Sequence, residues 1–225
     1  MKESLLEKID DKFLLVIFDL DGTLADTHQL IFDSFNFVMK KYKSIVMTPE
    51  EIMSYFGPPE DVCIKNMMGT DHFEDAWRDY LDYYEKHLDE SLVFPGIPEL
   101  LNDLKASMIL LGIFTGKGKE TTESTLRFHG IWDLFDVVVT GSSVKNHKPH
   151  PEGVEFALNK LKVLAHNAVV VGDSIADYRA AASSGTHFIA AMYDTFPRNH
   201  FDYLDCVRVH SVQELSQLLL ANSKH

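Results

Sequence analysis

Two aspartates that could do chemistry together, Asp19 and Asp21, lie two positions apart in the segment FDLDGT at residues 18–23. In an extended chain this spacing places both carboxylates on the same side of the backbone, and Gly22 allows a sharp turn after them. The segment directly follows an apolar run, where acids are costly in free energy unless a cation pairs with them. The spacing therefore predicts a site for a hard divalent cation with oxygen ligands, and Mg²⁺ is the expected ion.

Three residues further along the chain could hold a phosphate group. Thr115 and Gly116 follow a second apolar run and offer a hydroxyl and a backbone N–H to a phosphate oxygen. The chain has 21 Lys+Arg against 34 Asp+Glu, a net charge of −13, so a phosphate site needs a cation of its own. Lys148 is the expected cation, because the neighbouring Pro149 restrains the backbone there. Lys117 is expected to be solvated.

A second acidic segment, VVVGDSIAD at residues 169–177, also follows on an apolar run. Asp173 is placed to complete the metal site with the first two aspartates. Ser174 fits the N-cap of a helix that begins behind it. Two roles stay open for Asp177: it orients Asp173, Lys148 or a metal-bound water, or it interacts favourably with the dipole of that helix.

The elements that must position these residues follow from the apolar pattern. Short continuous apolar runs are typical of strands buried on both faces of a sheet. Helical patterns lie between them at residues 119–128, 151–161 and 176–184. This alternation predicts an α/β fold with a doubly wound parallel sheet, a Rossmann-like core whose ligands bind at the carboxyl ends of the strands. The predicted strands cover residues 13–18, 108–114, 137–140, 168–171 and 188–191, with a weaker candidate at residues 206–209.

The segment from residue 26 to residue 94 interrupts that alternation. Its apolar and aromatic residues recur at helical spacing, and residues 48–51 have the sequence of a helix capping box. The segment is therefore predicted to be purely helical, a small bundle inserted after the first strand, with the Phe-Pro-Gly sequence at residues 94–96 as the return hinge. Residues 1–25 and 95–225 would form the core.

Composition excludes several classes of function. A net charge of −13 and a pI of about 5.2 oppose binding to nucleic acid or to an anionic membrane. No apolar run approaches the roughly 18 to 20 residues of a membrane span. Cys63 and Cys206 form neither a disulfide framework nor a CxxC zinc motif, and Cys63 is expected inside the helical bundle. Residues 1–11 carry acids where a secretory signal carries cations, so we expect a cytoplasmic protein.

Taken in order, the motifs resemble those of the haloacid dehalogenase-like hydrolase superfamily. The matching residues are the DLDGT segment that begins at Asp19, the pair Thr115 and Gly116, Lys148, and the GDSIAD segment that ends at Asp177. The helical insert resembles the small cap domain of that superfamily. The whole chain is most similar to the phosphoglycolate phosphatase-like branch, which also contains pyrophosphatases and β-phosphoglucomutases. Many phosphoglycolate phosphatases have Asn where this chain has Gly116.

The resemblance implies a mechanism and a cofactor. Asp19 would attack phosphorus and form an aspartyl-phosphate. Asp21 would protonate the leaving group and then deprotonate the hydrolytic water. Mg²⁺ would be held by Asp19, the backbone carbonyl of Asp21 and the carboxylate of Asp173. Thr115 and Lys148 would steady the transferring phosphoryl group.

The expected activity is hydrolysis of a small phosphorylated metabolite, a phosphoglycolate-like phosphomonoester, by a Mg²⁺-dependent phosphatase. The cap would close over the site, and the cap and the linker at residues 56–60 would read the substrate. Three alternatives stay open: a β-phosphoglucomutase-like phosphomutase, a pyrophosphatase, and an inactive scaffold of the same fold. True dehalogenases and phosphonatases lack the second acid, so Asp21 favours cleavage of C–O–P or P–O–P bonds. The sequence does not indicate the oligomeric state.

Overall fold

The computed structural model describes residues 13–69, 72–194, 201 and 203–222, so the acidic segment at residues 1–11 lies outside the described part of the chain. A central sheet of six parallel strands has the order β5-β4-β1-β6-β7-β8. β1 lies in the interior of the sheet and the later strands are added on both sides of it, which is a doubly wound topology. The strands are β1 (Leu15–Phe18), β4 (Leu110–Phe114), β5 (Val137–Val139), β6 (Ala168–Gly172), β7 (His187–Ala191) and β8 (Val207–Val209).

The interior strand β1 explains why the apolar runs form this sheet. Its residues are all fully buried, and they alternate between the two faces. Val16 and Phe18 contribute to one hydrophobic core, whereas Leu15 and Ile17 contribute to a second core. A strand that is buried on both faces needs helices on both faces. The α/β prediction is confirmed, and each predicted strand is present close to its predicted bounds.

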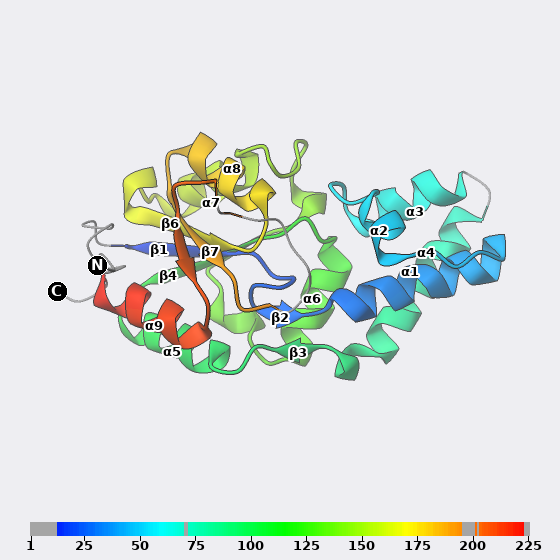
Figure 1. Ribbon diagram of the computed structural model, residues 1–225, viewed down its shortest axis with the longest axis horizontal. Coiled ribbons are helices and arrows are strands. Elements are labelled where there is room, and N and C mark those ends of the chain that lie inside the picture. The colour runs from blue at the N-terminus through cyan, green and yellow to red at the C-terminus, as the bar shows by residue number, and fades with distance from the viewer. Residues whose placement is uncertain (1–12, 70–71, 195–200, 202, 223–225) are drawn as a thin grey trace.

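Helices cover both faces of the sheet (Figure 1). The first core includes residues of α5, α6 and α9, and the second includes residues of α7 and α8. The predicted helices at residues 119–128, 151–161 and 176–184 correspond to α6, α7 and α8. The bounds are α5 (Ile97–Ala106), α6 (Lys119–Phe128), α7 (Glu152–Leu161), α8 (Ile175–Ser184) and α9 (Val212–Ala221).

The inserted helices lie together beside the sheet, at the right of Figure 1. Their aromatic and aliphatic stripes pack on one another in a third hydrophobic core, formed by residues between Leu30 and Leu88. Thr48 and Glu51 form the predicted capping box, and Cys63 is buried in this core as predicted. The helices are α1 (His28–Lys43), α2 (Pro49–Met53), α3 (Glu60–Met68) and α4 (Phe73–Lys86).

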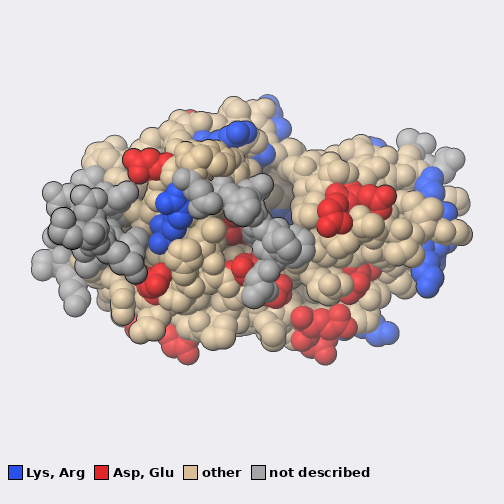
Figure 2. Space-filling view, viewed as in Figure 1, with Lys and Arg blue, Asp and Glu red and all other residues tan. Residues whose placement is uncertain are grey.

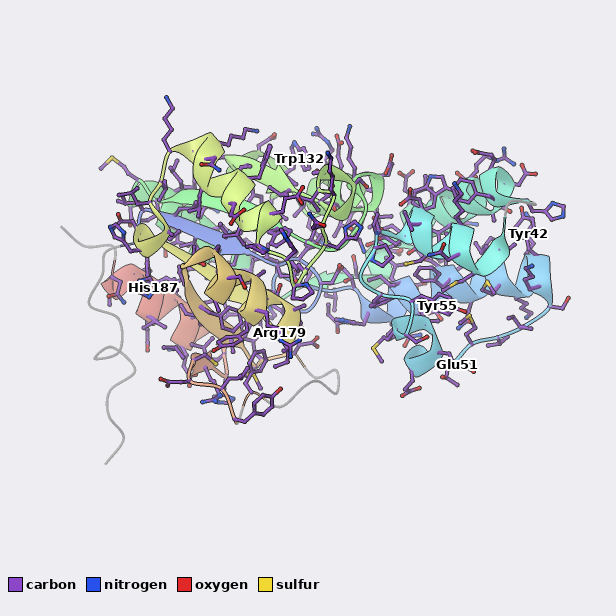
Figure 3. All side chains as sticks on the ribbon, turned by 90° about the horizontal axis from the view of Figure 1, so that it is seen from above. Tyr42, Glu51, Tyr55, Trp132, Arg179 and His187 are labelled. Atoms are coloured by element: carbon purple, nitrogen blue, oxygen red, sulfur yellow. The ribbon has the colours of Figure 1, made fainter. Side chains whose placement is uncertain are left out.

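A view at right angles shows the same two groups of elements side by side (Figure 3). The insert carries the labelled Tyr42, Glu51 and Tyr55, and the sheet with its surrounding elements carries Trp132, Arg179 and His187. Asp and Glu side chains lie on both groups and near the junction between them (Figure 2). None of the helices in the described residues has the length and apolar character that a membrane span requires.

The ends of the insert are extended, so the prediction of a purely helical segment is wrong there. β2 (Ala25–Asp26) and β3 (Leu92–Val93) pair as a short antiparallel sheet. The outgoing and returning segments of the chain run side by side in opposite directions, and their backbone groups hydrogen-bond to each other. Strands of two residues carry too little apolar pattern to be recognised in a sequence. The division into core and cap at residues 26 and 94 stays a prediction.

Candidate active site

The predicted site residues lie at the carboxyl ends of neighbouring strands. β1 pairs with β4 on one side and with β6 on the other. Asp19 follows β1, Thr115 follows β4, and Asp173 follows β6. The Asp19 N–H donates to the carbonyl of Val171 in β6 at 2.9 Å, so the register of the strands fixes the backbone at Asp19. The parallel sheet thus brings distant segments of the chain to one edge.

Asp19, Asp173 and Asp177 form a cluster of carboxylates. Each offers one oxygen atom, and these atoms all lie within 4.8 Å of one another. Asp173 is 2% exposed and Asp177 is 0% exposed. Buried like charges at this spacing need a counter-charge, and a donor set of carboxylate oxygens suits a hard cation such as Mg²⁺. The residues present therefore fit the metal that the resemblance implies.

Lys148 lies between two of these carboxylates. Its Nζ is 3.0 Å from Asp19 Oδ1 and 2.5 Å from Asp177 Oδ1, and it lies over the ring of Phe114. Burial acts to lower the pKa of Lys148, but the carboxylates of Asp177 and Asp19 outweigh burial and raise that pKa above its ordinary value. Lys148 is thus a fixed positive charge beside Asp19, where the sequence predicted a local cation.

Asp177 combines the two roles that the sequence left open. Its Oδ2 accepts hydrogen bonds from the Ser174 N–H at 3.0 Å and the Ser174 hydroxyl at 2.6 Å, and Ser174 Oγ accepts from the Asp177 N–H at 3.2 Å. This capping box begins α8 and confirms Ser174 as its N-cap. The other carboxylate oxygen faces Lys148. A Cβ on Gly172 would lie 2.5 Å from the Asp177 carboxyl carbon, so only glycine fits there.

The two aspartates of the first motif have opposite electrostatic settings. Burial and the neighbouring Asp177 carboxylate raise the pKa of Asp19 to about 7, although Lys148 acts to lower it. For Asp21, burial also acts upward, but Lys117 and the donated hydrogen bond of the Thr27 hydroxyl outweigh it and hold the pKa below its usual value. The chain turns directly after them as predicted, because Gly22 has a φ of 73°.

Lys117 is buried, so the expectation of a solvated side chain is wrong. Its side chain is 1% exposed, and its Nζ lies 3.2 Å from Asp21 Oδ1 and 3.5 Å from Glu60 Oε1. It also lies 4.7 Å from the centre of the Tyr84 ring. Glu60 and Tyr84 belong to the inserted helices α3 and α4. The periodicity of the sequence does not predict that these two helices pack on Lys117. The linker at residues 56–60, which was expected to recognise the substrate, ends at Glu60.

Thr23 is a site residue whose role the sequence did not assign. Its hydroxyl donates to Asp173 Oδ1 at 2.8 Å, and its side chain is fully buried. The Tyr193 hydroxyl donates to the backbone carbonyl of Thr23 at 2.6 Å, which anchors this turn. Thr23 is the last residue of the DLDGT motif, and this position in the motif is the sequence feature that could have identified it as a site residue. Thr23 orients a carboxylate of the candidate metal site.

Thr115 and Gly116 lie between the end of β4 and the start of α6. Thr115 is 1% exposed, and its hydroxyl oxygen accepts a hydrogen bond from the Lys117 N–H at 3.1 Å. A Cβ built on Gly116 meets no atom closer than 4.0 Å, the carbonyl oxygen of Gly57. The backbone of the linker between α2 and α3 thus lies beside Gly116.

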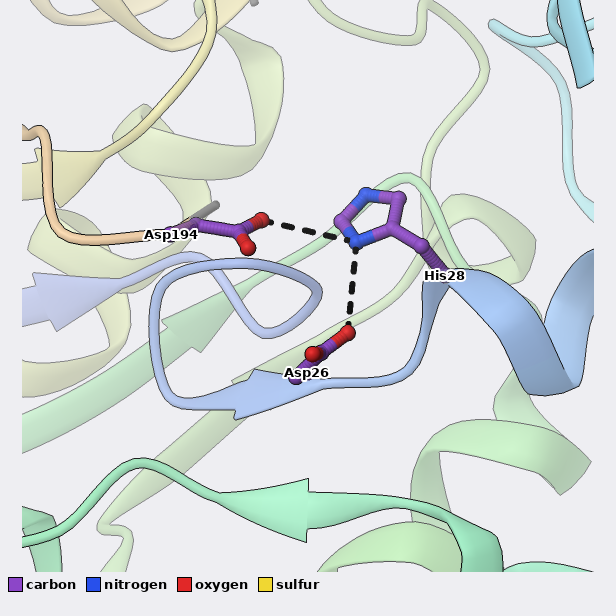
Figure 4. Close-up of side chains that lie close together, drawn as sticks. All are labelled: Asp26, His28 and Asp194. Atoms are coloured by element: carbon purple, nitrogen blue, oxygen red, sulfur yellow. Dashed lines mark ion pairs between the residues drawn. The ribbon is translucent and has the colours of Figure 1, made fainter. Parts of the chain in front are cut away.

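A second group of titratable residues holds the first inserted helix to the core (Figure 4). His28 Nδ1 lies 3.5 Å from Asp194 Oδ2 and 4.0 Å from Asp26 Oδ1. His28 begins α1, and Asp194 follows β7. The neighbouring Thr27 donates to Asp21, so this contact fixes the start of α1 close to the second aspartate of the first motif.

Comparisons with known proteins agree with this geometry. A family model described as haloacid dehalogenase-like hydrolase matches residues 16–191. The pyrophosphatase PpaX of Bacillus velezensis is 34% identical over 179 residues, which cover 79% of this chain and 82% of that protein. The phosphoglycolate phosphatase of Nitrosospira multiformis is 30% identical over 218 residues, which cover 92% of this chain and 96% of that protein.

A solved structure is also similar over most of its length. The crystal structure of CbbY from Rhodobacter sphaeroides in complex with phosphate has a TM-score of 0.78 and 25% sequence identity. The similarity covers 90% of this chain and 96% of that chain. The family match spans the sheet from β1 to β7 together with the inserted helices, so it includes every motif named above. This chain belongs to the haloacid dehalogenase-like hydrolase family, and the resemblance noted from its motifs is confirmed.

Proposed function

We propose that this hydrolase is a Mg²⁺-dependent phosphatase that cleaves a small phosphomonoester, similar in size to phosphoglycolate, through an aspartyl-phosphate on Asp19. The proposal depends above all on the contact of Asp19 with Lys148 at 3.0 Å within a cluster of carboxylates at the ligand-binding edge of the sheet. Phosphoryl transfer requires a nucleophile, a cation and a metal-binding donor set at one place. Relatives named pyrophosphatase and phosphoglycolate phosphatase support phosphate chemistry.

In the first half-reaction, a carboxylate oxygen of Asp19 forms a bond to phosphorus while the bond from phosphorus to the leaving oxygen breaks. The leaving oxygen takes the electron pair of that bond and receives a proton from Asp21. Lys148 keeps positive charge beside the transferring group during this step. The products are the free alcohol and the phosphorylated Asp19.

In the second half-reaction, a water oxygen attacks phosphorus and the water gives a proton to Asp21. The bond between phosphorus and Asp19 breaks, which restores the carboxylate and releases phosphate. Lys117 and Thr27 favour the ionised form of Asp21, which is the form that accepts this proton. The proton that Asp21 gains here is the one it donates in the next turnover, so one water molecule is added across one ester bond.

The remaining predicted residues bind rather than react in this proposal. Thr115 and Gly116 lie at the end of β4, where a hydroxyl and a backbone N–H can contact oxygens of the phosphoryl group. Asp19, Asp173 and the backbone carbonyl of Asp21 would hold Mg²⁺, which supplies positive charge to the nonbridging oxygens. The inserted helices would line the site and exclude bulk water from it.

The substrate is proposed to be a small molecule rather than a nucleic acid or a membrane component, and the location to be cytoplasmic. The net charge of −13 supports the first part of this proposal, because a broad surface for an anionic polymer or an anionic membrane would need the opposite sign. Pyrophosphate is a second candidate substrate, because relatives named PpaX are 34% identical to this chain.

The test is release of free phosphate from a panel of phosphorylated metabolites, with Mg²⁺ and with EDTA. The panel includes phosphoglycolate, pyrophosphate, hexose phosphates and nucleoside monophosphates. We expect turnover only with Mg²⁺, and loss of turnover in Asp19→Asn but not in Asp103→Asn, a matched change at an exposed position of α5. Undiminished activity in EDTA, or in Asp19→Asn, would reject the proposed mechanism.

A further inference from the structure

Lys117 is a buried cation that contacts Asp21, the proposed proton carrier. It lies on the loop between β4 and α6, and its side chain is 1% exposed. Its backbone is held as well, because its N–H donates to the Thr115 hydroxyl oxygen at 3.1 Å. The ammonium group is therefore shielded from solvent, and it acts on the site through the groups that it touches.

The ammonium group binds one particular oxygen of Asp21. Lys117 Nζ lies 3.2 Å from Asp21 Oδ1, and the Thr27 hydroxyl donates to the same oxygen. Within the described part of the chain, Oδ2 of Asp21 accepts no hydrogen bond. Two donors on Oδ1 fix the orientation of the carboxyl group and make Oδ2 the more favourable position for a proton. The side chain of Asp21 is 19% exposed, so it is not sealed off as Lys117 is.

Glu60 of the inserted helices holds Lys117 in this position. Its Oε1 lies 3.5 Å from Lys117 Nζ. The Glu60 carboxylate is itself fixed, because Oε2 accepts the Gly118 N–H at 2.5 Å and Oε1 accepts the Thr121 hydroxyl at 2.8 Å. Glu60 is 7% exposed. The ammonium group thus bridges a carboxylate of the insert and a carboxylate of the first motif.

Tyr84, also from the inserted helices, is a second contact that restrains Lys117. The centre of its ring lies 4.7 Å from Lys117 Nζ, within the range of a cation–π interaction. The ring is fully buried, and its hydroxyl shares a hydrogen bond with the Thr125 hydroxyl at 2.8 Å. A lysine side chain has a flexible four-carbon stem, so fixed contacts are needed to hold its ammonium group at one place.

We infer that Lys117 is a positioning residue: held by Glu60 and Tyr84 of the insert, it orients Asp21 through Oδ1 and leaves Oδ2 as the oxygen that carries the proton. The inference rests on the proposed phosphatase function and assigns a task to a side chain that makes no proposed contact with substrate.

This role differs in its kinetic consequences from two other roles for a buried lysine. A residue that only stabilises the fold, or one that binds the phosphoryl group, affects all phosphate esters alike, because they share that group. A residue that acts through the proton carrier affects chiefly esters whose leaving oxygen needs a proton. The dependence on the leaving group therefore separates these roles.

The test compares kcat/KM for 2-phosphoglycolate, whose alkoxide needs a proton to leave, and for p-nitrophenyl phosphate, whose leaving group does not. If 2-phosphoglycolate is not hydrolysed, the best alkyl phosphate of the panel replaces it. Lys117→Met keeps much of the length of the side chain and removes the ammonium group. We expect its kcat/KM to fall roughly 10-fold to 10²-fold more for the alkyl phosphate than for p-nitrophenyl phosphate. Lys119→Met, at an exposed position of α6, is the matched control and should leave both values unchanged.

Two further variants address folding and the part played by the insert. Lys117→Met alone leaves Glu60 as a buried charge without its cation, which is destabilising. The double variant Glu60→Gln with Lys117→Met removes both charges, and it should fold and show the same selective loss. Glu60→Gln alone should show a smaller loss in the same direction, because Tyr84 still contacts Lys117. Thermal unfolding midpoints establish that each variant is folded.

The outcomes are distinguishable. An equal loss for both substrates, or no loss, in folded Lys117→Met or in the double variant overturns the inference. Wild-type values in folded Glu60→Gln overturn the part assigned to the insert. Failure of the wild type to hydrolyse any alkyl phosphate of the panel rejects the proposed function instead, whatever the variants do.

Discussion

At the scale of single residues, Asp19 and Asp21 differ in their partners although only Leu20 separates them. Asp19 contacts Lys148 and belongs to the carboxylate cluster, whereas Asp21 contacts Lys117 and Thr27. Asp19 lies within the carboxylate cluster that would hold the metal, as the proposed nucleophile must. The side chain of Asp21 does not belong to that cluster, which leaves it available as the proposed proton carrier.

The proton-carrying role of Asp21 can be tested with leaving groups of different basicity. Asp21→Asn should lower kcat for an alkyl phosphate roughly 10² to 10⁴-fold, because an alkoxide needs a proton to leave. The first step with p-nitrophenyl phosphate should be slowed much less, since p-nitrophenolate leaves without one. Rapid mixing should therefore give a burst of p-nitrophenolate followed by slow turnover. An equal loss of the first step for both substrates would exclude Asp21 as the acid.

Thr23 gives a second test at this scale, because it hydrogen-bonds to Asp173 but has no proposed contact with substrate. Thr23→Val keeps the shape of the side chain and removes the hydrogen bond that orients the carboxylate. We expect the Mg²⁺ concentration for half-maximal activity to rise about tenfold. Thr186→Val, which removes a buried hydroxyl between α8 and β7, is the matched control. The same Mg²⁺ dependence in Thr23→Val as in the wild type would contradict a positioning role.

At the scale of elements, the sequence was sufficient where one local pattern determines the structure. The run that contains β1 is apolar throughout because both faces of the strand are buried, and helix α6 matches its predicted bounds. The alternation of strands and helices also predicted that ligands bind at the carboxyl ends of the strands. The short β2–β3 pair was missed, because it depends on two segments that are distant in sequence and meet only when the insert folds.

The burial of Lys117 could not be predicted from the sequence either, because it also depends on segments that are distant in sequence. Its partners Asp21 and Glu60 are distant in sequence, and its local surroundings, Gly-Lys-Gly, look like an exposed loop. The contact between Thr23 and Asp173 spans 150 positions. Local pattern therefore predicted which residues reach the edge of the sheet, whereas their pairwise contacts required the three-dimensional structure.

The core of the inserted helices can be tested through Cys63. This thiol is 1% exposed, burial raises its pKa to about 12, and its Sγ donates to the carbonyl of Tyr55 at 3.2 Å. In a Cys206→Ser variant, Cys63 is the single thiol, because the chain has two cysteines. We expect no measurable reaction with a disulfide reagent at pH 8 in the folded state and complete reaction in denaturant.

Cys206 supplies the comparison for that experiment. It is partly exposed, so the Cys63→Ser variant should react in the folded state. Reaction of Cys63 as fast as that of Cys206 would mean that the packing of the inserted helices is loose.

At the scale of the whole molecule, α6 is the helix where the insert and the core meet. Tyr84 of α4 hydrogen-bonds to Thr125 at 2.8 Å, and Glu85 accepts a hydrogen bond from Ser124 at 2.8 Å. Glu60 holds the start of the same helix. One core helix therefore carries contacts from both α3 and α4, and its first turn adjoins Lys117 of the candidate site. The contacts of the insert with the core therefore meet the surroundings of Asp21 at the start of this helix.

The stability of the folded chain should report the metal site without reference to activity. Asp19, Asp173 and Asp177 repel one another, and Lys148 compensates only part of their charge. A cation that binds the folded state alone stabilises it by about 2.7 kcal/mol when present at roughly 100 times its Kd. For a chain of this length that corresponds to a rise on the order of 5 °C in the thermal unfolding midpoint. Mg²⁺ should produce this rise, and NaCl at the same ionic strength should not.

Asp173→Asn separates this effect from general screening of an acidic protein. The variant removes one of the repelling charges, so without Mg²⁺ its unfolding midpoint should be at least as high as that of the wild type. It also removes a proposed ligand, so its response to Mg²⁺ should vanish. Asp103→Asn removes the same charge from an exposed position and should keep the full response. A wild-type response in Asp173→Asn would mean that Mg²⁺ acts elsewhere on the chain, and the carboxylate cluster would then lose its proposed role.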